Sequence, residues 1–121
     1  MIKMIVLIKR RPDVSAEEFG RYYEYEHAPL AARILPAHVA AAIKNYRQDH
    51  AVRIGRGNTD PAYDCVTEFE FEDLAGLRIW TEWYRGEGGA ALRVDEENFM
   101  DVGERVILVT EVRPTELGAR C

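Results

Sequence analysis

The sequence predicts an α+β fold, in which two helices cover one face of a four-stranded antiparallel sheet in the order β-α-β-β-α-β. Three features predict it: apolar β-branched runs near both ends of the chain, a strictly alternating run in the middle, and two amphipathic stretches of helical period between them. The 121 residues suit one domain, because two domains of half that size would bury inadequate cores. We place this domain over residues 1–113.

The first strand and the first helix occupy the N-terminal third. Residues 2–9 form an apolar run that ends before Pro12, which is typical of a buried strand. Ser15 and Glu18 form a capping box, so a helix should begin there. The residues that follow at helical spacing are Phe19, Tyr22, Tyr23, Glu26, His27, Leu30 and Ile34. Because Pro29 biases Ala28 away from helical geometry, we predict that the helix ends or kinks just after His27.

The middle of the chain predicts two strands joined by a loop. Residues 43–52 mix β-branched, aromatic and polar residues as a strand does, whereas residues 39–42 could equally extend the preceding helix. Residues 54–62 are rich in glycine, asparagine, aspartate and proline and predict a loop. Residues 63–73 alternate as the third strand. One side carries Cys65, Thr67, Phe69 and Phe71, and the other carries Asp64, Val66, Glu68, Glu70 and Glu72.

The C-terminal third completes the pattern. Asp73 should cap a second helix over residues 74–85, which glycines at 86, 88 and 89 end. A short helical piece over residues 90–94 could follow, and Asp95 could cap one more turn ahead of Phe99. Residues 105–112 predict the last strand, and residues 114–121 a flexible C-terminal tail. The resulting order is the ferredoxin-like split βαβ arrangement.

Both faces of the first and the last predicted strands are apolar. In the first strand Ile2, Met4, Val6 and Ile8 lie on one side, and Ile5 and Leu7 on the other. Helices cover only one face of such a sheet, and an exposed apolar face of this size marks an interface or a ligand site. We therefore expect a homodimer that packs sheet to sheet and encloses a space for a small hydrophobic or aromatic molecule.

Composition excludes several other classes of partner. The balance of 16 basic against 21 acidic residues gives a net charge of −5, which does not suit binding to nucleic acid or to an anionic membrane surface. No apolar run approaches the roughly 20 residues that span a bilayer, and no secretory signal is recognisable, so we expect a cytoplasmic protein. Both cysteines are expected to be free thiols, with Cys65 in the core. We expect no metal site and no cofactor, because zinc-ligand spacings and nucleotide-binding glycine motifs do not occur.

Five residues are candidates for acid/base chemistry. His27 at its helix end could be a general acid or proton shuttle, or could simply bond a backbone carbonyl. Tyr46 and His50 share one face of the second strand, which is either a cavity wall or an exposed edge. Asp64 and Glu68 share a face of the third strand, where a carboxylate in an apolar cavity would have a raised pKa; the alternative is a solvated face.

The chain resembles the EthD family of the dimeric α/β-barrel superfamily over roughly residues 1–112. The resemblance rests on Leu7-Ile8-Lys9-Arg10, Ser15 to Phe19, His27-Ala28-Pro29-Leu30, Asn45-Tyr46 to His50, Tyr63-Asp64 with Glu68, and residues 95–99 followed by Asp101. It implies a sheet-to-sheet dimer with a pocket in each subunit, and it adds Tyr63, Asp95 and Phe99 as candidate substrate-binding residues. Residues 31–42 and 54–62 depart from the family pattern and could line the pocket mouth. The resemblance therefore does not identify the substrate of this protein.

The resemblance also bounds the function. Related proteins include lactone isomerases and polyketide dehydratases and cyclases. We therefore expect a cofactor-independent acid/base enzyme for a small cyclic or aromatic carbonyl compound, in catabolism or polyketide-like biosynthesis. His27 or His50 would move the proton, Tyr46 would bond the enolate oxygen, and Asp64 or Glu68 would orient the imidazole or act as base.

Other readings of the sequence remain. One alternative is a binding protein for small hydrophobic ligands without chemistry. Another is a haem-dependent, oxygenase-like protein, which would need an axial histidine facing the cavity. A purely structural dimer is the third.

Overall fold

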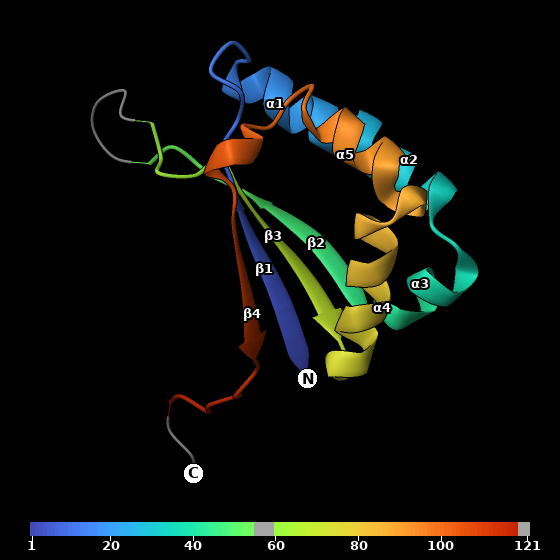
Figure 1. The fold of residues 1–121 in the computed structure, drawn as a ribbon. Coiled ribbons are helices and arrows are strands. Elements are labelled where there is room, and N and C mark those ends of the chain that lie inside the picture. Colours follow the sequence, from blue (N-terminus) through green and yellow to red (C-terminus); the bar gives the residue numbers. More distant parts are fainter. Residues whose placement is uncertain (55–59, 119–121) are drawn as a thin grey trace.

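The computed structural model describes residues 1–54 and 60–118 and has the predicted α+β order (Figure 1). Its strands are β1 (Ile2–Ile8), β2 (Asn45–His50), β3 (Cys65–Phe71) and β4 (Val106–Glu111). They form one antiparallel sheet in the order β2-β3-β1-β4. The helices lie together on one face of this sheet, and edge strand β4 has no helix over it (Figure 1).

The helical layer consists of several short segments. They are α1 (Ala16–Tyr22), a π turn η1 (Tyr23–His27), α2 (Ala28–Ile34), α3 (Ala37–Ala42), α4 (Leu74–Arg85), the 3₁₀ turn η2 (Glu87–Gly89), α5 (Ala90–Glu96) and the 3₁₀ turn η3 (Val102–Glu104). The predicted caps are confirmed: Ser15 Oγ accepts from the Glu18 N–H at 3.1 Å, and Asp73 Oδ1 from the Gly76 N–H at 3.0 Å. Residues 39–42 thus belong to the separate helix α3.

The core lies between the helices and the face of the sheet that the alternating pattern predicts. Cys65, Thr67, Phe69 and Phe71 are all buried. Paired residues of antiparallel strands point to the same side, so the register Val6↔Thr67 places Val6 on this face as well. Cys65 is a buried free thiol, as predicted.

The helix predicted to end or kink just after His27 does not end there, although its regular α-helical pattern is interrupted over Tyr23–His27. Ala28 has helical angles, φ −62° and ψ −43°, and its N–H donates to the Tyr23 carbonyl five residues back. The chain passes through the π turn into α2 and stays helical to Ile34. We attribute the π turn to Pro29, whose ring would clash with the carbonyl four residues earlier in a regular α-helix. Widening the helix by one residue accommodates the proline.

Asp95 also differs from its predicted role. It lies within α5, which runs unbroken from Ala90 to Glu96, and its side chain bonds other side chains rather than capping a new turn. The predicted loop over residues 54–62 falls largely on residues 55–59, and Cys121 lies at the terminus; both are outside the described residues. The flexible tail over 114–121 stays a prediction. In the described ranges no helix has the length and apolarity to cross a membrane.

Candidate functional site

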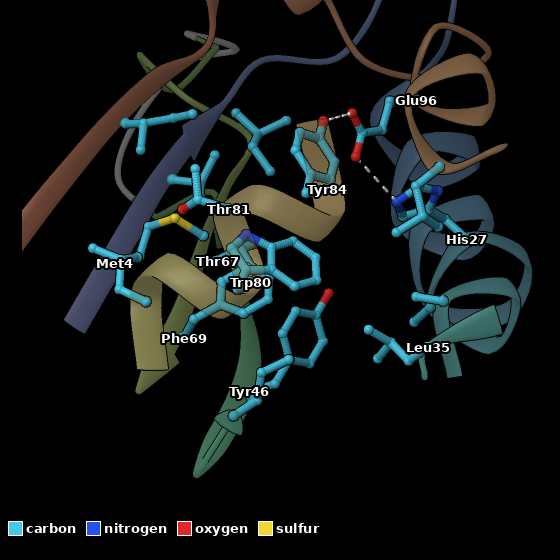
Figure 2. A pocket seen from close by; sticks show the side chains of 18 of the residues that line it. Met4, His27, Leu35, Tyr46, Thr67, Phe69, Trp80, Thr81, Tyr84 and Glu96 are labelled. Carbon is cyan, nitrogen blue, oxygen red and sulfur yellow. Dashed lines mark hydrogen bonds and ion pairs between the residues drawn. The ribbon is translucent and has the colours of Figure 1, made fainter. Parts of the chain in front are cut away.

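A cavity of about 550 Å³ lies between the helical layer and the covered face of the sheet (Figure 2). This volume is in the usual range for small-molecule sites. Its lining is mostly apolar and includes Met4, Val6, Leu35, Phe69, Leu77, Trp80, Leu92, Ile107 and Val109. Ile107 and Val109 on β4 are half exposed, so the cavity opens beside the uncovered edge strand. The family resemblance implied a pocket in each subunit, and this cavity lies within one chain. The expected chamber between two sheets stays a prediction.

His27 lies in the wall of this cavity with a carboxylate at each ring nitrogen. Nδ1 is 2.8 Å from Asp95 Oδ2, and Nε2 is 3.5 Å from Glu96 Oε2. The side chains of His27 and Glu96 are both less than a tenth exposed. The contact at Nδ1 has the length of a hydrogen bond, whereas the contact at Nε2 is longer.

Glu96 is held in place from its other side. The Tyr84 hydroxyl and the Arg105 guanidinium both donate to Oε1, the latter at 2.9 Å. Burial raises the pKa of Glu96, but hydrogen bonds from His27 and Tyr84 and the charge of Arg105 outweigh it and leave that pKa below its ordinary value. Burial, with the nearby Glu96 charge, raises the pKa of Tyr84 to about 12. The wall therefore presents an ionised carboxylate beside a phenol that keeps its proton (Figure 2).

The π turn explains how His27 reaches the cavity. Tyr23 and His27 are both buried and both line it. Their ring centroids are 5.7 Å apart, and Phe99 packs against the two rings at 5.2 and 5.0 Å. π turns recur at functional sites because they shift side chains out of the regular helical register. Phe99, a predicted substrate-binding residue, is therefore a core residue that supports the histidine from behind.

The sheet contributes a second polar group at Tyr46. Its hydroxyl accepts from Gln48 Nε2 at 3.0 Å and donates to the Tyr23 hydroxyl at 3.4 Å, which bonds Thr67 Oγ1 at 2.6 Å. Burial raises the pKa of Tyr46. His50 Nε2 lies 2.8 Å from Gln48 Oε1, so His50 supports Tyr46 through Gln48 and does not itself line the cavity.

Asp64 and Tyr63 lie away from this cavity. Asp64 accepts from the Arg10 backbone N–H at 2.9 Å and pairs with the Arg10 guanidinium at 3.4 Å. With His50 it lines a separate cavity of about 220 Å³ beside α1. Tyr63 is half-buried and is not part of the lining of the larger cavity. The structure thus brings Tyr46 and His27 to one cavity and leaves Asp64 and Tyr63 outside it.

Glu68 lies on the opposite face of the sheet. It pairs with Lys3 at 2.9 Å and with Arg47 at 3.0 Å. The raised pKa expected for a cavity carboxylate is wrong. Hydrogen bonds from Arg47 and Lys3, together with the charge of Lys3, lower the pKa of Glu68 to about 2. The error follows from strand alternation, because Phe69 faces the cavity and its neighbour must face away.

Glu68→Gln should reduce stability at neutral pH and much less in acid. A carboxyl whose pKa falls from about 4.3 in the unfolded chain to about 2 in the fold stabilises the fold above the unfolded value. That stabilisation is lost as the pH drops through the folded pKa. Urea unfolding of the wild type and the variant at pH 7 and near pH 2 should show the stability gap closing. The exposed Glu72→Gln serves as control, and a gap that is the same at both pH values contradicts the assignment.

Sequence reasoning missed Glu96, Tyr84 and Arg105. Tyr84 lies in the predicted helix over residues 74–85, and Glu96 lies in the stretch over residues 95–99 that carries the family resemblance, but neither pattern marks them as site residues. Their meeting depends on η2, which turns the chain back so that α5 packs beside η1 and α4. Local sequence patterns carry no signal for that contact. Among residues 1–54 and 60–118, no group of three potential ligands is arranged to hold a metal ion.

The fold and its cavity define a class: a small α+β protein with an apolar, ligand-sized pocket between sheet and helices of one chain. The chain belongs to the EthD family, because the model of the EthD domain matches residues 11–103. The family resemblance drawn from the sequence is therefore confirmed.

Solved structures have the same fold. An EthD-like protein from Ralstonia eutropha has a TM-score of 0.68 at 18% identity, covering 95% of this chain and 94% of its own. An EthD family protein from Bacillus halodurans has a TM-score of 0.62 at 18% identity, covering 93% and 100%. A dimeric protein of unknown function and ferredoxin-like fold from Bacteroides fragilis has a TM-score of 0.58 at 19% identity, covering 92% and 95%. The search of curated proteins found no match.

Proposed function

We propose that the protein is a cofactor-independent acid/base enzyme that acts on a small cyclic or aromatic carbonyl compound bound in the 550 Å³ cavity. The observation that carries this proposal is His27, a buried imidazole in an apolar wall with a carboxylate at each nitrogen. Proton abstraction next to a carbonyl needs such a group within reach of the substrate.

The two nitrogens of His27 have different tasks in this proposal. The contact of Nδ1 with Asp95 is short, and it fixes the ring and keeps a proton on Nδ1. The contact of Nε2 with Glu96 is 3.5 Å long and leaves Nε2 available to a bound molecule. When Nε2 takes a proton, the ionised Glu96 stabilises the imidazolium. Arg105 fixes Glu96, so that carboxylate acts as a charge partner rather than as the base.

Tyr46 is proposed to donate to the oxygen that gains charge. Because Gln48 donates to its hydroxyl, the proton of Tyr46 is free to point elsewhere. It currently bonds Tyr23 at 3.4 Å, a length that a better acceptor can replace. The raised pKa of Tyr46 keeps this phenol protonated at neutral pH. An enolate oxygen beside Tyr46, with its carbon acid toward His27, would use both groups.

The lining supports a flat, largely apolar substrate. Phe69 packs against Tyr46 and Trp80 with ring centroids 4.9 and 4.8 Å away, and Trp80 stacks on Tyr84 at 5.4 Å. Aromatic walls of this kind bury rings well and exclude water from the reacting groups.

A homodimer through the uncovered sheet face is part of the proposal. On that face the register aligns Val66, Leu7 and Val106 in one row and Ile5 with Leu108 in the next. Leu108 is 49% exposed in the single chain. Contiguous apolar surface of this kind is usually covered, and the Bacteroides fragilis relative is described as dimeric.

Leu108→Glu should convert the dimer into monomers, because it would bury a carboxylate without a partner at the interface. Sedimentation velocity on the wild type and the variant measures this. Leu74→Glu, at an exposed position of α4, is the matched control and should stay dimeric. A wild type that sediments as a monomer at micromolar concentration would contradict the dimer and leave the cavity chemistry untouched.

The function is tested by identifying what the cavity holds. Native mass spectrometry of the purified protein should detect a retained apolar molecule, and incubation with that compound and its carbonyl analogues should yield an isomer, a dehydrated product or a cyclised product. A compound that binds with measurable affinity and is recovered unchanged would favour the alternative of a binding protein.

A further inference from the structure

We propose that His27 exchanges protons with bulk water across the helical layer, through Asp95 to a groove on the outer surface, and not through the cavity mouth. The inference rests on the proposed acid/base role of His27. It assigns Asp95 a second task beyond holding the ring.

His27 lies in the helical layer, between the cavity and a groove on the outer surface of the helices. Its Nε2 points to Glu96 in the cavity wall, and its Nδ1 points to Asp95 Oδ2 at 2.8 Å. The other oxygen of Asp95, Oδ1, accepts from the Tyr22 hydroxyl at 2.5 Å and from Asn98 Nδ2 at 3.2 Å. Both of these donors line an outer groove of about 660 Å³.

The outer groove is accessible to water. Exposed residues of α1 and η1 line it, among them Tyr25, which is 66% exposed. It shares no lining residue with the cavity. The Asp95 side chain is 16% exposed against 7% for His27, so the carboxylate is the more solvent-accessible member of the pair. Helices α1 and α5 run side by side over this region (Figure 1).

A proton path through the helical layer is needed because a filled cavity blocks the direct route from water to His27 Nε2. A bound molecule that fills the apolar pocket excludes water from Nε2, so protons cannot enter or leave there during a reaction. Asp95 remains in contact with water whether or not the cavity is filled. Its pKa lies below the ordinary value, because hydrogen bonds from Tyr22, His27 and Asn98 outweigh its burial, so Asp95 is ionised at neutral pH and holds a proton only in transit.

The bonds balance over a cycle that adds one proton and removes another. In delivery, a proton on Asp95 Oδ2 moves to Nδ1 while the Nε2–H bond breaks and its proton joins the bound molecule. In removal, Nε2 takes a proton from the molecule while Nδ1 returns one to Oδ2. Water in the groove supplies or accepts the proton on Asp95. The ring returns to its starting tautomer without rotating, which suits its packing against Tyr23 and Phe99.

The exchange rates of the two ring protons test the path without a substrate. In protein labelled with ¹⁵N-histidine, at a pH where both ring nitrogens of His27 carry protons, the Nδ1 proton should exchange with water at least about tenfold faster than the Nε2 proton. Asp95→Asn keeps an acceptor for Nδ1–H but cannot take up the proton, so it should slow Nδ1 exchange by about tenfold or more. Glu97→Gln, at an exposed neighbouring position, should leave both rates unchanged.

The opposite results overturn the path. Faster exchange at Nε2 in the wild type would place the route at the cavity mouth, and this measurement needs no variant to fold. An unchanged Nδ1 rate in Asp95→Asn would give Asp95 a positioning role alone. If turnover still depends on His27 in either case, the relay fails and the proposed enzyme function stands.

Discussion

Replacing His27 with alanine is expected to lower turnover about 100-fold or more, the usual contribution of a positioned acid or base. The loss should appear in kcat, because the imidazole acts on the reacting proton and contributes little to holding an apolar substrate. Glu96 does not substitute for it, since the hydrogen bonds and the charge around that carboxylate keep its pKa low and its basicity weak. Steady-state kinetics on the compound identified in the cavity would measure the effect.

Two controls separate chemistry from folding in that experiment. His38→Ala removes an exposed histidine of α3 and should leave kcat unchanged. His27→Gln retains hydrogen-bonding capacity between the two carboxylates but cannot carry the proton, so it should lose turnover while unfolding near the wild-type urea midpoint. If His27→Gln turns over substrate at the wild-type rate, the proposed role of His27 is wrong.

Phe71→Ala is expected to lower the free energy of unfolding by about 3–5 kcal/mol, the usual cost of truncating a buried phenylalanine. The Phe71 side chain is fully buried at the end of β3, and its Cβ lies 3.4 Å from the position that a Cβ on Gly76 of α4 would take. A helix packed that closely leaves a cavity behind when the ring is removed. Urea or thermal unfolding at pH 7 would measure the loss.

The Phe71→Ala variant should lower stability without changing substrate binding. Phe71 does not line the ligand cavity, so the variant should keep the wild-type KM at temperatures where it remains folded. Val94→Ala, at a position that is 66% exposed, should change stability by less than about 0.5 kcal/mol. An equally small change for Phe71→Ala would mean that the helical layer does not pack on the sheet as described.

Much of the fold could be predicted because its signals are local. The period-two alternation over residues 63–73 predicted which side chains of β3 are buried, and the caps at Ser15 and Asp73 predicted where α1 and α4 begin. Pro29 misled the prediction because a π turn can absorb a proline that a regular helix cannot. That choice depends on packing around His27 rather than on the neighbouring residues alone.

The candidate site was predicted in part. His27 and Tyr46 both reach the cavity, since each lies on a face whose direction follows from its own element. Glu68 was grouped with them because alternation within one strand does not give the register between strands. Tyr46 pairs with Phe69, so Glu68 points to the other face. His50 lines the smaller cavity and reaches Tyr46 only through Gln48.

By itself, the sequence determined the order of elements, the buried side of the strands, the family and two of the polar groups in the cavity. Only the tertiary structure decided that Asp95 and Glu96 meet His27, and that the pocket lies inside one chain. The physical reason is the range of the interactions. Periodicity and capping act over a few residues, whereas the contacts of His27 with Asp95 and Glu96 join positions 68 and 69 residues apart and exist only once α5 packs against the π turn.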